Sequence, residues 1–417
     1  MKNNDYALCA LVKIYRKKFD LSQSDIAKDI CVPSYVSKIE NGEIEPNIQI
    51  VELLLKKVGV NYRTENNFSE DEKNKIMEYF NSLFDFDRYH SEEIFPDIKK
   101  KKKKYLNSDY LIEYLMIEWH HLNSNEKNEN RQTEIEYLLS SVKNLMPSRE
   151  KGILYYLKSL SNESPETKKE LLKNAVMEYK NGYYFYQLGF TMLAGGNYTQ
   201  SLKYLDKADE IFMEEGNFRG LVFSKSIRGE VYYQLKDFDN SEIHNEGVIN
   251  LLEKSRTEDT YILGFKYFAL RSLANTAHNT GDFKKMEKIC KRIIDDQKKL
   301  GKIYTTSPYL LLSDFYFKNG EKELAIKYLK EAEKVQDVTL TVDLPFEKEL
   351  WNLYEYRTRH DDYLRTREYE KILLKLKDIV ENRGCFDYQG VVYDMLKEFY
   401  VANKRYKDAF FTSEKGL

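Results

Sequence analysis

The amino-acid sequence predicts an all-α protein with a small helical head at residues 1–64 and a right-handed superhelical array of helical hairpins at residues 65–417. Apolar residues recur at three- and four-residue spacing throughout the head, which is typical of helices. From about residue 69 onward the chain shows no strand-like alternation and contains only five prolines. A marker made of a short turn and an aromatic residue recurs about every 40 residues, which indicates a helical repeat array.

Composition limits how the chain could reach nucleic acid. Charged residues make up 32% of the sequence, but the net charge is only −2, so no overall basic field attracts the protein to DNA. The head has eight Lys and two Arg against four Asp and four Glu, so a DNA contact has to come from a local basic surface. Neither a secretion signal nor an apolar run of transmembrane length is visible. The four cysteines are widely spaced, at Cys9, Cys31, Cys290 and Cys385. This spacing indicates reduced thiols in a cytoplasmic protein, without disulfides or a zinc site.

The head is predicted to contain a helix-turn-helix. Helical spacing predicts a first helix over residues 5–19 and a second helix that begins at the capping residue Ser22. Pro33 suits the first turn of a third helix, where its missing N–H leaves no hydrogen bond unmade. Asn41-Gly42 ends that helix, because both residues tolerate the left-handed backbone conformation, and a closing helix follows. The apolar positions behind these predictions are Leu8, Leu11, Val12, Tyr15, Ile26, Ala27, Ile30, Val36, Ile39, Ile50, Leu53, Leu54 and Val58.

Beyond the head, the turn-and-aromatic marker separates pairs of predicted helices. Leu188-Gly189 precedes the first marker at the spacing of a tetratricopeptide repeat. Three less regular hairpins at residues 69–104, 107–146 and 148–180 bring the total to about nine, and their first helices are expected to line a concave face. Small residues follow several markers where helices approach closely, at Ala208, Ala325, Ala332 and Ala409. The markers are GGNY at 195–198, KDF at 236–238, GDF at 281–283, NGEK at 319–322, HDDY at 360–363 and NKRY at 403–406.

The concave face is a candidate binding surface, since helical hairpin arrays bind partners in their grooves. The repeat frame places Arg271, Asn275, His278 and Asn279 on the inner face of a helix at residues 267–280. An Asn amide donates and accepts hydrogen bonds, which suits a peptide backbone, and an Arg can bind a carboxylate at two points. The alternative is that these are ordinary solvated positions or contacts between repeats. Neighbouring repeats add Tyr186, Phe190, Tyr233, Gln234, Asp314, Phe317, Trp351 and Glu355.

Nothing in the sequence predicts an enzyme. There is no P-loop, no GxSxG, no HExxH and no cysteine–histidine cluster. His120 and His121 are adjacent, so on a helix they point about 100° apart and do not readily share a metal. We therefore expect no catalytic activity, no cofactor and no metal. The lysine run at residues 99–104 either adds contacts to DNA phosphates or forms a solvated helix end, and the second interpretation is favoured.

The stretch from Leu21 to Pro46 resembles the phage-repressor (XRE) type of helix-turn-helix, and especially its variant in PlcR- and NprR-type regulators. The shared landmarks are L-S-Q at Leu21–Gln23, I-C at Ile30-Cys31, S-x-V-S-K-I-E-N-G at Ser34–Gly42, and then Pro46. The resemblance implies a structural ion pair between Arg16 and Glu40. The alternative is that the hairpin serves only packing or dimerisation. The DNA contacts that the resemblance implies are a phosphate for Gln23, the major groove for Ser34, Tyr35 and Lys38, and the DNA backbone for Ser37 and Asn41.

Over its whole length the chain resembles the RRNPP regulators (Rgg, Rap, NprR, PlcR and PrgX types) of low-GC Gram-positive bacteria and their phages, with a size most like NprR. The resemblance implies a cytoplasmic homodimer that binds a palindromic DNA operator. It also implies that a short imported signalling peptide, bound on the concave face, controls DNA binding. Activation and repression by the peptide are both compatible with the resemblance. One alternative is that the array docks a response regulator, as Rap-type proteins do. Another is an adaptor on DNA that has no peptide ligand.

Overall fold

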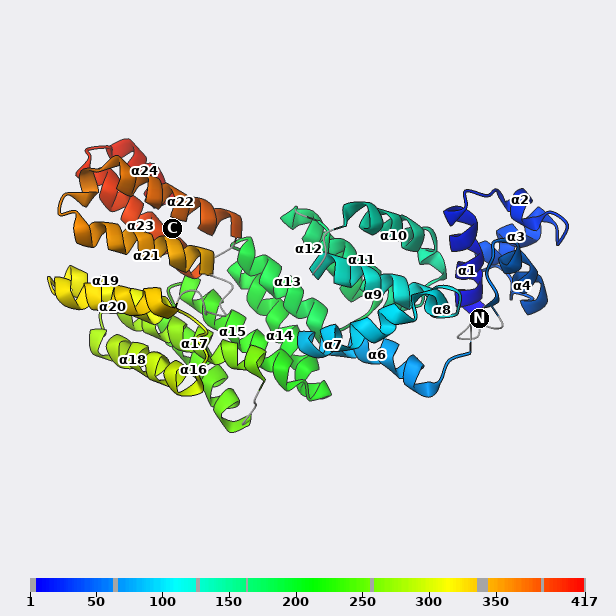
Figure 1. Ribbon diagram of the computed structural model, residues 1–417, viewed down its shortest axis with the longest axis horizontal. Helices are drawn as coiled ribbons and strands as arrows, with labels where there is room; N and C mark the ends of the chain where they lie inside the picture. Colours follow the sequence, from blue (N-terminus) through cyan, green and yellow to red (C-terminus); the bar gives the residue numbers. More distant parts are fainter. Residues whose placement is uncertain are drawn as a thin grey trace. The chain divides into compact units, whose positions relative to one another are not determined.

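The computed structural model describes residues 5–62, 67–124, 128–162, 164–255, 259–335, 344–383 and 386–415, and these residues are mostly helical (Figure 1). The prediction of an all-α fold is confirmed. The chain divides into two compact units. Unit 1 comprises Met1–Gly195 with Lys203–Gly220, and unit 2 comprises Gly196–Leu202 with Leu221–Leu417. Among the described residues, no helix combines the length and the apolar character needed to span a membrane.

The head lies in unit 1 and consists of four helices, α1 (Asp5–Lys18), α2 (Gln23–Ala27), α3 (Pro33–Glu40) and α4 (Ile48–Lys57). Ser22 caps α2 in a reciprocal box with Asp25, in which each side chain accepts a backbone N–H of the other residue. The Asn47 side chain caps α4 by accepting the backbone N–H groups of Gln49 and Ile50. The apolar faces of the four helices meet in a core whose fully buried members include Leu11, Val12, Ile26, Val36, Ile39 and Leu54.

The rest of unit 1 is a series of helices packed around aromatic side chains, among them the fully buried Trp119 and Phe212. Two glycines make room for the Phe212 ring, because a Cβ added to Gly182 or Gly220 would lie 2.5 or 2.6 Å from it. Such an approach is closer than packed atoms permit. The helices are α6 (Glu70–Phe84), α7 (Arg88–Lys100), α8 (Lys102–Leu106), α9 (Leu111–Ser124), α10 (Glu129–Ser141), η1 (Lys143–Leu145), α11 (Ser148–Leu160), α12 (Pro165–Glu178), α13 (Gly182–Ala194) and α14 (Tyr198–Glu215), whose first residues belong to unit 2.

Unit 2 continues the hairpins, and its helices pack mainly against their neighbours in sequence. This nearest-neighbour packing is the property expected of a repeat array. The helices are α15 (Phe218–Gln234), α16 (Phe238–Ser255), α17 (Thr260–Asn279), α18 (Phe283–Leu300), α19 (Ser307–Lys318), α20 (Lys322–Val335), α21 (Leu344–Arg359), η3 (Tyr363–Arg365), α22 (Arg367–Arg383), α23 (Phe386–Ala402) and α24 (Tyr406–Lys415).

The turn markers found in the sequence coincide with chain reversals. Five of the six contain a residue with a left-handed backbone, namely Gly196, Lys236, Gly281, Gly320 and Lys404. Such a residue ends one helix and turns the chain toward the next. The alanines predicted at close helix contacts are buried, as expected for positions where only a small side chain fits: Ala208, Ala325, Ala332 and Ala409.

Candidate nucleic-acid interface and ligand-binding face

A buried carboxylate holds the helix-turn-helix together. Glu40, at the end of α3, is only 1% exposed. Arg16 of α1 donates to it twice, from Nε to Oε1 at 2.5 Å and from Nη2 to Oε2 at 2.8 Å. Arg16 also donates from Nη1 to the carbonyl of Leu21 at 2.7 Å. The predicted ion pair between Arg16 and Glu40 is confirmed, and it fixes α3 against α1 and the start of the helix-turn-helix.

Gln23, predicted to bind a DNA phosphate, also contacts this carboxylate. Its side-chain amide donates from Nε2 to Oε2 of Glu40 at 3.0 Å. An amide nitrogen carries two hydrogens, so one N–H remains for a phosphate. The contact orients Gln23 at the first position of α2, where helix N–H groups and the helix dipole also favour an anion.

The outer face of α3 presents two of the predicted DNA contacts directly to solvent. Ser34 and Lys38 are exposed and lie four residues apart, one helical turn. Tyr35 is half-buried, and its hydroxyl accepts the backbone N–H of Asn47 at 2.8 Å, which holds the ring beside the start of α4. Of the two residues predicted to lie near the DNA backbone, Ser37 is half-buried, and Asn41 is exposed and donates to the Glu43 carboxylate at 3.1 Å.

Two residues of the head have roles that the sequence alone did not indicate. Val32, the N-cap of α3, is 64% exposed although it is apolar. An exposed apolar residue at the start of a recognition helix can contact a thymine methyl group, and its position directly before Pro33 was the available signal. Lys57 is occupied within the fold, because its Nζ lies 2.6 Å from the carbonyl of Asp25 and 2.9 Å from that of Lys28.

The opposite face of α1 packs on α9, α10 and η1, so the head is docked on the hairpins of unit 1. The Tyr6 hydroxyl donates to Oε1 of Glu113 at 3.1 Å, and the Tyr15 hydroxyl donates to the carbonyl of Leu106 at 3.2 Å. Burial, reinforced by the neighbouring charge of Glu150, raises the pKa of Glu113 to about 7. One helix therefore connects the buried centre of the head to the array.

The lysine run at residues 99–104 ends α7 and begins α8, and much of its charge is neutralised within unit 1. Lys101 and Lys104 lie 2.9 and 2.8 Å from the carboxylate of Glu72, and Lys102 lies 2.6 Å from that of Glu118. Burial alone would raise the pKa of Glu72, but hydrogen bonds from Lys104, from the Ser69 backbone and from Lys101 lower it to about 2. The structure therefore favours the interpretation as a helix end over a phosphate-binding surface.

Part of the predicted ligand set comes together on α15 and α17 in unit 2. The amide of Asn279 donates to the Tyr233 hydroxyl at 2.8 Å. His278 is half-buried beside it, with Nδ1 3.5 Å from the Asn279 amide oxygen, and Asn275 is half-buried one turn earlier on α17. Gln234, the last residue of α15, donates to Glu230 at 2.6 Å. We call Tyr233, Asn275, His278 and Asn279 the amide cluster.

Other predicted ligand residues are engaged in packing within unit 2. Arg271 is 4% exposed, and its guanidinium lies over the Phe268 ring at 4.8 Å from the centroid. Asp314 is buried and lies 2.6 Å from Nη2 of the equally buried Arg357. The Asp314 carboxylate is therefore desolvated and already paired with Arg357. It joins α19 to α21 and does not face an open groove.

The aromatic and acidic members of the set divide in the same way. The Trp351 indole donates to the carbonyl of Leu329 at 2.9 Å, which directs it toward α20. Phe317 is half-buried, with the Arg357 guanidinium over its ring, and Glu355 pairs with Arg359. In unit 1, Phe190 is 38% exposed, whereas Tyr186 is buried and its ring centroid lies 4.9 Å from that of Phe86.

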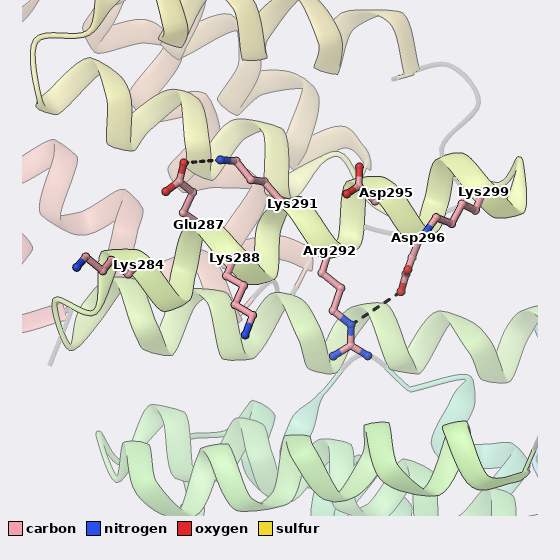
Figure 2. A pocket seen from close by; sticks show the side chains of 8 residues that line it. All are labelled: Lys284, Glu287, Lys288, Lys291, Arg292, Asp295, Asp296 and Lys299. Atoms are coloured by element: carbon pink, nitrogen blue, oxygen red, sulfur yellow. Dashed lines mark hydrogen bonds and ion pairs between the residues drawn. The ribbon is translucent and has the colours of Figure 1, made fainter.

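A shallow charged pocket in unit 2 lies apart from these predicted residues (Figure 2). All of its lining residues come from α18, and they are Lys284, Glu287, Lys288, Lys291, Arg292, Asp295, Asp296 and Lys299. Pairs one turn apart neutralise one another, with Glu287 2.7 Å from Lys291 and Asp296 4.0 Å from Arg292. The pocket is therefore the solvated face of an amphipathic helix, and no predicted ligand contact lies on it.

In the part of the chain that the structure describes, no group of histidine, cysteine and acidic side chains could hold a metal ion. The Tyr79 hydroxyl lies 2.8 Å from Nδ1 of His120, and burial lowers the pKa of that imidazole to about 4. His121 stacks on Phe95 with centroids 3.7 Å apart. Cys9, Cys31 and Cys290 are free thiols, and Cys385 lies outside the described residues.

Comparison with known proteins agrees with this architecture. A helix-turn-helix family model matches residues 12–63, and a tetratricopeptide repeat model matches residues 306–337. The chain is 22% identical over 394 residues to the transcriptional activator NprA of Geobacillus stearothermophilus, in an alignment that covers 94% of this chain and 77% of that protein.

Three solved structures share the fold at low sequence identity. The apo form of RapI has a TM-score of 0.61 at 13% identity, covering 83% of this chain and 98% of its own. A Rap protein complexed with the competence and sporulation factor has a TM-score of 0.57 at 14% identity, covering 83% and 96%. NprR in complex with its cognate peptide NprX has a TM-score of 0.53 at 15% identity, covering 82% and 98%.

The head and the hairpins therefore belong to one recognisable architecture. The helix-turn-helix is locked by Arg16 and Glu40 and docked on helical hairpins of unit 1, and a tetratricopeptide repeat is matched further along the chain. The sequence is similar along nearly all of its length to a transcriptional activator. The head of this chain matches the helix-turn-helix family, and the chain shares its fold with solved Rap and NprR proteins.

Proposed function

We propose that this chain is a cytoplasmic transcription regulator that binds a palindromic duplex DNA operator as a homodimer and is controlled by a short imported peptide. One observation carries the DNA-binding part: α3 exposes Ser34 and Lys38 while its opposite face is locked by the buried Glu40. A helix held in this way can enter a major groove without refolding, as recognition helices do. The similarity to a transcriptional activator supports this assignment.

The proposed homodimer fits the geometry of recognition. One head offers one recognition helix, which reads a single half-site, and two-fold symmetry presents two helices to a palindrome. The hairpin of α23 and α24 supports such an assembly, because it exposes large apolar side chains, at Val401, Tyr406, Phe410 and Phe411. A cluster of exposed apolar side chains marks a surface for contact with another protein, and a second copy of the chain is the proposed partner.

The amide cluster is the proposed receptor for the peptide. Its amide, imidazole and phenol groups are half-buried or exposed and are gathered at the ends of α15 and α17. Groups that both donate and accept hydrogen bonds can bind a peptide backbone whatever its side chains. Arg271, one turn from Asn275, supports this surface by packing on Phe268. Solved proteins of the same fold, NprR with NprX and Rap with the competence and sporulation factor, support a peptide as the ligand class.

DNA binding is tested with the full chain and with duplexes that it selects from a random library. Lys38→Ala should weaken binding about 5- to 150-fold if the lysine reads a base, since such a contact contributes about 1–3 kcal/mol. If Lys38 binds a phosphate instead, its loss should release about one counterion fewer on binding. The slope of log affinity against log salt concentration should then fall in magnitude by about 1. Lys330→Ala removes the same charge from exposed α20 and is the control. If the Lys38 variant binds like the Lys330 variant in both respects, α3 is not the recognition helix.

The peptide is identified by native mass spectrometry of the protein purified from its own host, and its affinity is then measured by calorimetry. Asn275→Ala should weaken binding by about 1–3 kcal/mol, because a peptide hydrogen-bonding group is left buried and unpaired. Asn352→Ala, at an exposed position of α21, is the matched control. Wild-type affinity in the Asn275 variant would place the receptor site away from the amide cluster.

A further inference from the structure

The turn between α6 and α7 is unusually buried for its composition. The last residue of α6 and the three residues that follow it, Phe84, Asp85, Phe86 and Asp87, alternate aromatic and acidic side chains, and both aromatic rings are less than 10% exposed. Phe86 has a left-handed backbone with φ 56°, a conformation that bulky side chains seldom adopt. Such a conformation persists only where surrounding contacts hold it, so the contacts around this turn identify what holds it.

The two rings of the turn occupy an aromatic site on α13 and α14. The Phe86 centroid lies 4.8 Å from that of Tyr183, 4.9 Å from that of Tyr186 and 5.7 Å from that of Phe212. Phe84 meets Tyr184 edge to face at 5.6 Å. The floor of the site is rigid, because Phe212 is pressed between two glycines that leave no room for a Cβ.

The polar groups of the turn are bound by the segment that joins α14 to α15. The Asn217 amide donates to the carbonyl of Phe84 at 3.3 Å and to the Asp85 carboxylate at 3.1 Å, and Arg219 pairs with Asp87. Asn217 is itself oriented by the backbone N–H of Gly220, which donates to its amide oxygen at 2.7 Å. This site therefore combines an aromatic pocket, a backbone-binding amide and a guanidinium for a carboxylate.

Those three elements are the ones that a peptide receptor uses, and here they bind the chain's own turn. We infer that Phe84–Asp87 is an internal ligand, and that the site formed by Tyr183, Tyr186, Phe212, Asn217 and Arg219 is a receptor for a peptide segment in which aromatic and acidic residues alternate. Tyr186 was predicted to face a ligand on the inner face of the array, and the internal ligand occupies that position. An external segment of the same chemistry competes with the turn for the site.

When the turn occupies this site, the first hairpin after the head is bound to a segment that lies far along the sequence. The bonded residues Asp87 and Arg219 are 132 positions apart. The contact lies directly before Gly220, where unit 1 ends. Release of the turn frees α6 and α7 from α13 and α14, and the effect of that release on DNA recognition rests on the proposed function.

Hydrogen exchange tests whether the polar contacts hold the turn. Arg219→Gln and Asp87→Asn should each speed exchange about tenfold in the segment 82–90, where the backbone N–H of Asp87 donates to the carbonyl of Ser82 at 2.7 Å. Asn keeps the capping ability that Asp87 provides to α7. The double variant should exchange no faster than the faster single variant, because the two side chains form one contact. Additive effects, or unchanged exchange, would overturn the inference.

A synthetic peptide tests the receptor directly. Its sequence is SLFDFDRY, residues 82–89, with capped ends and a fluorescent label. Phe86→Asn vacates the site while tolerating the left-handed turn, since Asn adopts that conformation readily. The labelled peptide should bind this variant at least tenfold more tightly than wild type, by fluorescence anisotropy, and a further Arg219→Gln should weaken it.

The controls separate this site from the peptide site of the amide cluster. A peptide with the same composition in scrambled order should not bind the Phe86→Asn variant. Phe283→Asn removes an aromatic residue that follows a turn in unit 2, is exposed and fills no such site, and it should create no binding. Equal binding to wild type and to the Phe86→Asn variant, or binding to neither, would refute an internal ligand. None of these measurements requires DNA or the co-purified peptide, so they stand independently of the proposed function.

Discussion

At the scale of single residues, the head depends on one buried carboxylate. Glu40 accepts from Arg16 and from Gln23, so a side chain of α3 holds α1 and α2 in place at once. The pair with Arg16 could be predicted because its two positions are landmarks of a motif with a fixed spacing. The contact of Gln23 could not, because an amide at the start of α2 has no sequence signal that distinguishes an internal partner from a phosphate.

Removing Arg16 should therefore destabilise the head. Arg16→Ala leaves the Glu40 carboxylate buried with only one amide donor, and breaking a buried pair costs about 3–5 kcal/mol. The measurement is thermal and urea unfolding of the full chain, followed in the head by hydrogen exchange of α3. Lys18→Ala removes a charge at an exposed position of the same helix and should change stability little. A melting temperature and α3 exchange like those of wild type would show that the pair does not hold the head.

At the scale of elements, local sequence patterns predicted the hairpins but not how deeply each side chain is buried. Turn residues with left-handed backbones mark the helix ends, and their approximate 40-residue spacing gives the repeat. The same frame assigned Asp314 and Trp351 to an inner face, and both are engaged between helices. The reason is non-local: Asp314 is buried because Arg357, on another helix, neutralises it, and helical periodicity identifies a face without identifying its partner.

The docking of α1 on α9 should make stability depend on pH. Glu113 faces Tyr6, Glu150 and Arg149, and its folded pKa of about 7 exceeds the ordinary value of 4.5. Between these two values the folded chain keeps the proton that the unfolded chain releases, so the free energy of unfolding falls as pH rises from about 4.5 to 7. The Glu113→Gln variant carries a permanently neutral group at this position. Its free energy of unfolding should therefore lack the part of the fall with pH that Glu113 causes.

Urea unfolding at pH 5, 6, 7 and 8 measures the effect. The Glu113→Gln variant should resemble wild type at pH 5 and be the more stable of the two at pH 8. Glu333→Gln, at an exposed position of α20, is the control and should follow the wild-type pH profile. If the Glu113→Gln profile also follows wild type, this carboxyl group is ionised in the folded chain.

At the scale of the whole molecule, the contacts that the sequence could not reveal are those between distant segments. Phe86 and Tyr186 are 100 positions apart, and nothing in the spacing of either helix pairs them. The head was predicted at residues 1–64, and its Tyr6 and Tyr15 attach it to the first hairpins. Local composition specifies helices and turns, whereas such pairings depend on the curvature that the repeats accumulate, which no single repeat encodes.

The proposed homodimer can be tested directly at the scale of the whole molecule. The exposed apolar residues of α23 and α24, which include Phe410, would be buried where two copies meet by a two-fold axis. Phe410→Glu places a charge in that contact, and loss of a central aromatic anchor costs about 2 kcal/mol or more, roughly a 30-fold weaker dimer. Light scattering coupled to size exclusion should show monomer at micromolar concentration.

Met177→Glu adds the same charge at an exposed apolar residue of α12 and should leave the dimer intact. The monomeric variant should also bind a palindrome no more tightly than a single half-site, because its two heads are no longer linked. A Phe410→Glu variant that remains dimeric would place the interface elsewhere on the molecule.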